Sequence, residues 1–162
     1  MGVTPAFTWV AQDLRALDEV QGEVLVLTTF SNERPLRGLT GLVDWRLCGG
    51  LSRLLLAGFA SGAVGERVLC PSRGRMSHPK VLLMGLGPRA EHRTDRALAV
   101  AGDAAETVQG LGASSMTCGL FGLEHLASPL DRGTRELTAL LASFPGLREI
   151  VLVSDTPEAG AR

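Results

Sequence analysis

The spacing of apolar residues along this chain separates strands from helices. The run EVLVLTTF at residues 23–30 is β-branched and apolar throughout, which is typical of a strand covered on both faces of a sheet. Other apolar runs bounded by turn residues predict further strands at 7–12, 66–70, 80–85, 114–120 and 148–153. We therefore expect a sheet whose central strands are buried.

Two long segments between these strands show helical spacing. Alanine and aliphatic residues recur every three or four positions after Thr94, which we predict as the N-cap of a helix that Gly112 ends. A later helix is predicted to follow Ser128 as its N-cap, with Pro129 as its first helical residue. Both helices would present an apolar stripe to the sheet.

A third helical pattern follows residue 41 and places four leucines on one face, namely Leu47, Leu51, Leu54 and Leu55. Gly49 and Gly50 interrupt it. Because each glycine lowers helix propensity by about 1 kcal/mol, we expect a kink or two short helices there. Trp45 in this segment could anchor an interface beside Arg46, although a core position is the commoner one for tryptophan.

The order of these elements predicts the fold class. Strands that alternate with helices after about residue 80 call for parallel pairing, whereas the neighbouring runs at 66–70 and 80–85 suggest one antiparallel pair. We predict an α/β fold, a three-layer α/β/α sandwich with a mixed, mostly parallel central sheet. Residues 1–154 should form one domain, and the polar tail at 155–162 should be flexible.

Composition narrows the choice of partners and compartment. The net charge of the 162-residue chain is −1 and no run of like charge occurs, so charge gives no support for a nucleic-acid partner, which stays open. No segment has the length and apolarity of a membrane span, and the first residues do not resemble a signal peptide. We expect a cytoplasmic protein with no membrane contact.

The residues that could carry catalysis or hold a metal are scattered. The three cysteines and three histidines stand singly, the histidines in polar loops, and no pair has a metal-ligand spacing. Glu124 and His125 lie near Cys118 in sequence, but we interpret them as unrelated loop residues and Cys118 as a packing residue. We expect no metal, no cofactor and no catalytic residue.

Two glycine-containing loops are candidate ligand sites. Residues 85–90, GLGPRA, match a dinucleotide fingerprint, but Pro88 removes a donor and the next helix starts late, so a tight turn is the favoured interpretation. The loop at 31–41 follows a buried strand, where α/β folds place their clefts, yet it could also be an ordinary surface loop. The side chains and glycines that we select as ligand-binding candidates are Asn32, Arg37, Gly38, Thr40, Gly41, Gly85, Gly87 and Gly119.

Three motifs in order resemble the N-terminal domain of the leucyl aminopeptidase family. They are GLSRLL at 50–55, GAVGE at 62–66 and VLLMGLG at 81–87, and an alanine-rich helix follows them. The resemblance covers about residues 23–120. It implies a fold similar to macro domains. It also implies that the two-metal active site, with the signature NTDAEGR, belongs to a separate C-terminal domain that does not occur in this sequence.

This resemblance sets the functional expectation. In the full enzymes the N-terminal domain looks like an assembly and regulatory element of a hexamer, and in some members it takes part in DNA binding. We therefore expect a non-catalytic binding or scaffold protein, without aminopeptidase activity, that self-associates or docks on a protein partner. The alternative is a macro-domain-like binder or hydrolase of ADP-ribose or a related nucleotide, although the 31–41 loop lacks the consecutive glycines of such binders.

Overall fold

The strongest apolar run of the sequence forms the centre of the sheet. In the computed structural model, which describes residues 3–156, strand β2 (Val24–Phe30) lies between β4 (Lys80–Gly87) and β5 (Ser115–Cys118), parallel to both. The six strands follow the order β1-β6-β5-β2-β4-β3, in which β1 (Ala6–Ala11) and β3 (Arg67–Pro71) are the edge strands and β6 (Glu149–Ser154) lies between β1 and β5. Only β3 and β4 pair antiparallel among these strands, which confirms the mixed, mostly parallel sheet.

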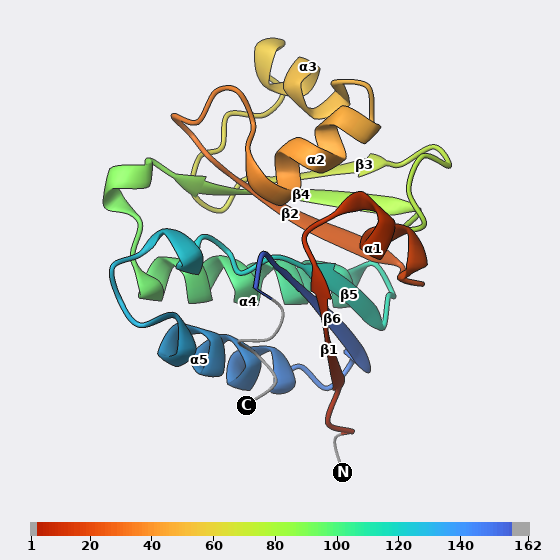
Figure 1. Cartoon of the computed structure of the whole chain (residues 1–162), viewed down its shortest axis with the longest axis vertical. Helices are drawn as coiled ribbons and strands as arrows, with labels where there is room; N and C mark the ends of the chain where they lie inside the picture. Colours follow the sequence, from red (N-terminus) through yellow and green to blue (C-terminus); the bar gives the residue numbers. More distant parts are fainter. Residues whose placement is uncertain (1–2, 157–162) are drawn as a thin grey trace.

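Helices cover both faces of the sheet (Figure 1). On one face lie α1 (Leu14–Glu19), α2 (Gly38–Arg46) and α3 (Gly50–Leu56), and on the other lie α4 (Thr94–Gly110) and α5 (Leu130–Ala142). Two 3₁₀ turns, η1 (Arg89–Glu91) and η2 (Leu123–His125), precede α4 and α5. The predicted three-layer α/β/α sandwich is confirmed.

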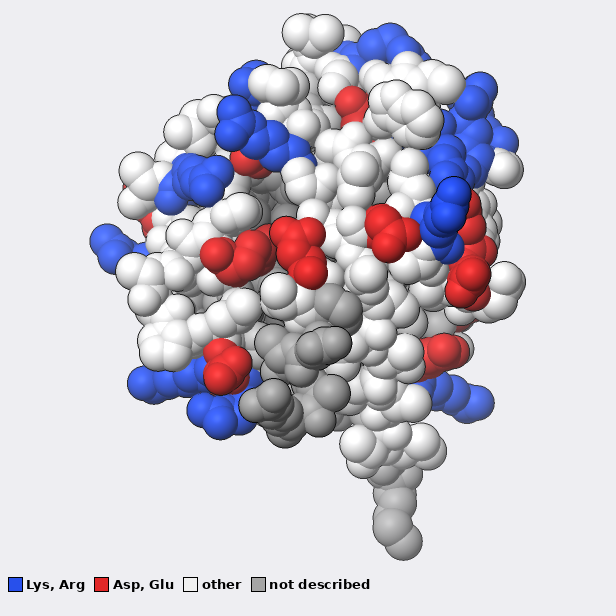
Figure 2. Space-filling model, in the orientation of Figure 1, with Lys and Arg blue, Asp and Glu red and all other residues white. Residues whose placement is uncertain are grey.

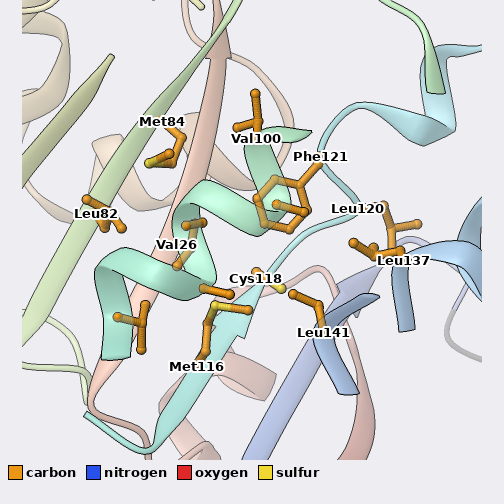
Figure 3. Close-up of a cluster of buried hydrophobic side chains, with 14 of the residues drawn as sticks. Val26, Leu82, Met84, Val100, Met116, Cys118, Leu120, Phe121, Leu137 and Leu141 are labelled. Carbon is orange, nitrogen blue, oxygen red and sulfur yellow. The ribbon is translucent and has the colours of Figure 1, made fainter. Parts of the chain in front are cut away.

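Alternation along β2 explains why both layers are needed. Val24 and Val26 belong to the apolar cluster under α4 and α5, whereas Leu25 and Leu27 belong to the cluster under α1, α2 and α3. All four side chains are buried. Figure 3 shows the first cluster, in which Met116 and Cys118 of β5 lie near Leu141 of α5.

The starts of α4 and α5 differ from the predictions, because neither helix has a side-chain cap. Thr94 is the first helical residue of α4 and Arg93 occupies its N-cap, with no side-chain cap hydrogen bond. Pro129 is the N-cap of α5 and the helix begins at Leu130, so the capping role predicted for Ser128 is wrong. The sequence pattern also missed α1, whose six residues are too few to show a period.

The glycine pair divides the third helical pattern into α2 and α3, as predicted. Gly49 has a φ of 76°, and the carboxylate of Asp44 accepts hydrogen bonds from the N–H groups of Leu51 (2.8 Å) and Ser52 (3.1 Å), which satisfies the start of α3. Trp45 is 74% exposed, so the expected core position is wrong.

Two predicted irregular segments, at 31–41 and 155–162, compare with the structure as follows. Residues 31–41 are not all loop, because α2 begins at Gly38. Of the flexible tail predicted at 155–162, residues 157–162 lie outside the described residues. Across residues 3–156, none of the helices combines the length and apolarity that crossing a bilayer requires.

Candidate functional site

A pocket lies where the chain leaves the carboxyl ends of the parallel strands. After β2 the chain turns to the α2–α3 face, whereas after the neighbouring strands β4 and β5 it turns to the α4–α5 face. Connections that diverge in this way leave a crevice above the strand ends, the position at which open α/β sheets bind ligands. The pocket found there has a volume of about 210 Å³.

Residues that follow five of the six strands contribute to the lining. Gln12 follows β1, Gly119 follows β5 and Asp155 follows β6, while Phe30 and Leu86 come from the ends of β2 and β4. The polar and charged lining residues are Gln12, Thr28, Glu33, Arg37, Thr40, Arg89, Glu124, His125 and Asp155. The pocket thus combines an apolar floor with carboxylates of three residues and guanidinium groups of two.

The structure brings together half of the sequence-predicted ligand residues. Arg37, Gly38, Thr40 and Gly119 line the pocket. The Thr40 hydroxyl donates to the carbonyl oxygen of Thr28 (2.6 Å), which fixes α2 to the end of β2. Ligand binding by these residues stays a prediction.

The other four candidates do not line this pocket. Asn32 Oδ1 accepts a hydrogen bond from the Arg89 N–H (3.0 Å), so it fastens the 31–37 loop to η1. Gly41 borders a shallow hollow beside Trp45. Gly85 packs against the backbone of residues 62–63, and Gly87, with a φ of 75°, donates its N–H to the Gly62 carbonyl oxygen (2.8 Å). Position 85 needs glycine because of this close approach, and position 87 because of its positive φ.

Sequence reasoning missed the aromatic and ionic wall of the pocket. The guanidinium carbon of Arg89 lies 5.5 Å from the ring centroid of Phe30, and Arg89 Nη1 lies 3.4 Å from Glu33 Oε1. Arg89 is thereby held over the pocket from the turn after β4. Its position directly after a strand end was the available signal.

The rings of two histidines, His92 and His125, lie next to the Phe30 ring. His92 packs edge-on against the Phe30 ring, with the centroids 5.1 Å apart, and its Nε2–H donates to the Phe121 carbonyl oxygen (3.0 Å). Burial lowers the pKa of His92, so the imidazole is neutral near pH 7. His125 is more exposed and its Nε2 lies 3.7 Å from Glu124 Oε1. The histidines were expected in polar loops. His92 and His78 do lie in loops, but both side chains are buried, His78 fully.

The geometry argues against two of the chemistries considered from sequence. The N-terminus of α4 lies at Thr94, beyond η1, so its N–H groups are not part of the glycine turn that a dinucleotide fingerprint needs. Cys118 is enclosed in the core, and burial raises the pKa of its thiol to about 12, which makes it a packing residue. Within residues 3–156, no three His, Cys, Asp or Glu side chains gather closely enough to hold a metal ion.

Comparisons with known proteins agree with this architecture. The family model for the cytosol aminopeptidase family, N-terminal domain, matches residues 21–143. A probable cytosol aminopeptidase of Corynebacterium diphtheriae is 34% identical over 119 residues, which cover 73% of this chain and 24% of that protein. The chain therefore spans about a quarter of the length of this curated relative.

Solved structures share the fold at low sequence identity. The macrodomain of Mycobacterium tuberculosis DarG has a TM-score of 0.71 and 13% identity, covering 91% of this chain and 97% of that one. A Trypanosoma brucei macrodomain in complex with ADP-ribose has a TM-score of 0.71 and 14% identity, covering 96% and 66%. A mutant tomato leucine aminopeptidase has a TM-score of 0.63 and 18% identity, covering 93% and 33%. The fold is macrodomain-like, and by its matched residues the chain belongs to the cytosol aminopeptidase family as an N-terminal domain.

Proposed function

We propose that this domain is a non-catalytic binding or scaffold element that docks on a protein, either a partner or a second copy of itself, through the α2–α3 side of the sheet. The observation that carries the proposal is the exposure of large apolar side chains there: Trp45 is 74% exposed, Leu56 86% and Phe59 74%. Exposed aromatic residues are enriched at protein interfaces.

The absence of peptide cleavage is part of this proposal. The family match covers the N-terminal domain, and the resemblance assigns the two-metal active site to a separate domain. A cytoplasmic location also belongs to the proposal, because the family is named for the cytosol.

The test is the effect of removing the exposed aromatic residues on association. We expect light scattering after size exclusion, together with capture from cell extract, to detect a dimer, a larger assembly or a partner. Because loss of a central tryptophan costs about 2 kcal/mol or more, the double variant Trp45→Ser and Phe59→Ser should weaken association roughly 30-fold.

The matched control is Leu111→Ser, which removes an exposed apolar side chain after α4, away from α2 and α3. It should leave association unchanged. A wild-type chain that stays monomeric at all concentrations and captures no partner would contradict the proposal.

A second candidate function is binding of ADP-ribose or a related nucleotide in the pocket at the strand ends. Its support is the position of the pocket and the fold shared with a macrodomain solved with ADP-ribose. Arg37 and Arg89 would meet the phosphates, but the lining also carries Glu33, Glu124 and Asp155, which disfavour a dianion.

Thermal melting with ADP-ribose tests this candidate. A ligand at 100 times its Kd adds about 2.7 kcal/mol to the free energy of unfolding, so 1 mM ADP-ribose should raise Tm if the function is real. The variant Arg37→Ala should remove most of the shift, and Arg135→Ala on α5 should not. An unchanged Tm and no heat in calorimetry at millimolar ligand would exclude the function.

A further inference from the structure

A second groove lies on the α3 side of the molecule and shares no lining residue with the strand-end pocket. It has a volume of about 390 Å³ and runs between the α2–α3 segment and the chain that leaves β3. The half-buried Leu47 and Leu54 supply apolar surface from the helical side, above the buried Leu51, and Pro71 lines the groove from the end of β3. A groove of this size accommodates a few side chains of a peptide.

Arginines without acidic partners border this groove. Arg53, Arg73 and Arg75 line it, and none of them forms an ion pair with another residue of the described chain. Arg53 Nη1 donates to the Cys48 carbonyl oxygen (2.7 Å), which holds its guanidinium at the rim. The carboxylate nearest to Arg53 in sequence, Asp44, is buried and accepts hydrogen bonds at the start of α3. The one nearest to Arg73 and Arg75, Glu66, accepts hydrogen bonds from the N–H groups of Ser61 and Gly62.

The distribution of charged side chains over the surface bears on the same question. In Figure 2, Lys and Arg side chains lie around the rim of the visible face, and some of them lie in its upper part, where Figure 1 shows α2, α3 and the turn between β3 and β4. Acidic side chains lie mainly across its middle. The groove therefore presents positive charge that the described part of the chain does not balance locally.

One buried polar group of the lining lacks a partner. Ser72 is 1% exposed, and its hydroxyl oxygen makes no hydrogen bond within residues 3–156. The Ser72 N–H donates to the Pro79 carbonyl oxygen (3.0 Å), which fixes the backbone at the groove. A buried hydroxyl without a partner is uncommon in folded proteins.

The chemistry of the lining selects one kind of occupant. Guanidinium groups bind carboxylates with two hydrogen bonds, and leucine walls accept apolar side chains. A second hollow, lined by Trp45 and Arg46, shares Cys48 and Arg75 with the groove and extends it toward the exposed tryptophan. No aromatic side chain lines the groove itself, so within it nucleic-acid bases would find no aromatic ring to stack on, and a free phosphate would leave its aliphatic walls unused.

From these observations we propose that the groove bordered by Arg53, Arg73 and Arg75 binds an acidic peptide segment of a partner protein, with carboxylates on the arginines and an apolar side chain between Leu47 and Leu54. This inference rests on the proposed protein-docking function and specifies its partner. The segment alternates Glu or Asp with Leu or Phe.

Fluorescence anisotropy with the full chain and a labelled peptide of alternating Glu and Leu residues tests the proposal. We expect binding that weakens several-fold between 50 and 300 mM NaCl, because exposed charges are screened. The double reversal Arg73→Glu and Arg75→Glu should raise Kd at least tenfold. The control Arg135→Glu and Arg148→Glu makes the same change in net charge at exposed positions in α5 and before β6, and should change Kd less than twofold.

The remaining arms decide what the groove recognises. A peptide with Gln in place of Glu should not bind, and 10 mM inorganic phosphate should not displace the acidic peptide. Any one of four results would overturn the proposal. The Gln peptide could bind equally well, phosphate could displace the acidic peptide, or the double reversal could leave Kd unchanged. The fourth is tighter binding of a single-stranded oligonucleotide that the same reversal weakens. If association still depends on Trp45 while the acidic peptide fails to bind, the docking function stands and this inference alone is wrong.

Discussion

Acidification from pH 7 to pH 4 should remove about 3 kcal/mol of the free energy of unfolding through His78 alone. This side chain is fully buried, and burial lowers its pKa from 6.5 to about 4. Its Nε2 lies 2.7 Å from the Thr117 hydroxyl oxygen and its Nδ1 3.3 Å from that of Ser77. The neutral imidazole is thus the form that the folded chain holds.

The sign follows from the two pKa values. Between pH 6.5 and 4 the unfolded chain binds a proton at His78 that the folded chain does not, so stability falls as pH falls through this window. Burial lowers the pKa of His92 as well, which acts in the same direction. Hydrogen bonds to backbone N–H groups lower the pKa of Glu23 from its usual 4.5, so its contribution begins to be lost near pH 4.5 and falls further below that.

Urea unfolding at half-unit steps from pH 7.5 to 4 measures this slope. His78→Gln should flatten the slope between pH 6.5 and 4.5, whatever it does to stability at pH 7. A slope that His78→Gln leaves intact would show that another group carries the acid sensitivity.

His78 also shows where prediction from the sequence ends. Strand and helix existence follows from local periodicity, which is why β2, α4 and α5 were predicted close to their observed bounds. The burial of His78 depends on Thr117, which is 39 residues distant in sequence, and on Gly22, where an added Cβ would lie 2.7 Å from Nε2. Contacts of this range leave no periodic signal in the chain.

The candidate site was predictable only in part for the same reason. Arg37, Gly38 and Thr40 follow one strand, so a single local rule placed them at the pocket. The opposite wall, with Arg89 over Phe30, requires the knowledge that β4 lies beside β2. Strand order is a property of the whole fold, so the two walls could not be joined before the sheet was known.

Replacing Gly85 by alanine should destabilise the fold by about 3 kcal/mol, at the upper end of the usual cost of overpacking, or by more. A Cβ at this position would overlap the Ala63 carbonyl oxygen and lie 2.7 Å from the Gly62 carbonyl carbon. The obstructing atoms belong to backbone that cannot move freely. The Gly85 N–H donates to the Glu66 carbonyl oxygen (2.9 Å), and the Gly65 N–H donates to the Gly85 carbonyl oxygen (3.2 Å).

Further restraint comes from the side chain of Glu66, whose Oε2 accepts hydrogen bonds from the N–H groups of Ser61 (2.8 Å) and Gly62 (2.7 Å). The turn that faces Gly85 is therefore tied at both ends, and relief of the overlap would require breaking these bonds or shifting β4. Since β4 lies between β2 and β3, a shift would disturb two strand pairings at once.

Gly102→Ala provides the matched control. Gly102 lies within α4, and an added Cβ there would meet only Phe144 Cζ at 4.0 Å, an ordinary contact. Alanine in a helix interior is favoured over glycine by about 0.5–1 kcal/mol, so this variant should be more stable than the wild type. Urea midpoints of the two variants, measured at pH 7 with equal m-values, should therefore move in opposite directions. If Gly85→Ala unfolds at the wild-type midpoint, the close approach of β4 to residues 62–63 does not constrain position 85, and that glycine would regain its place among the ligand-binding candidates.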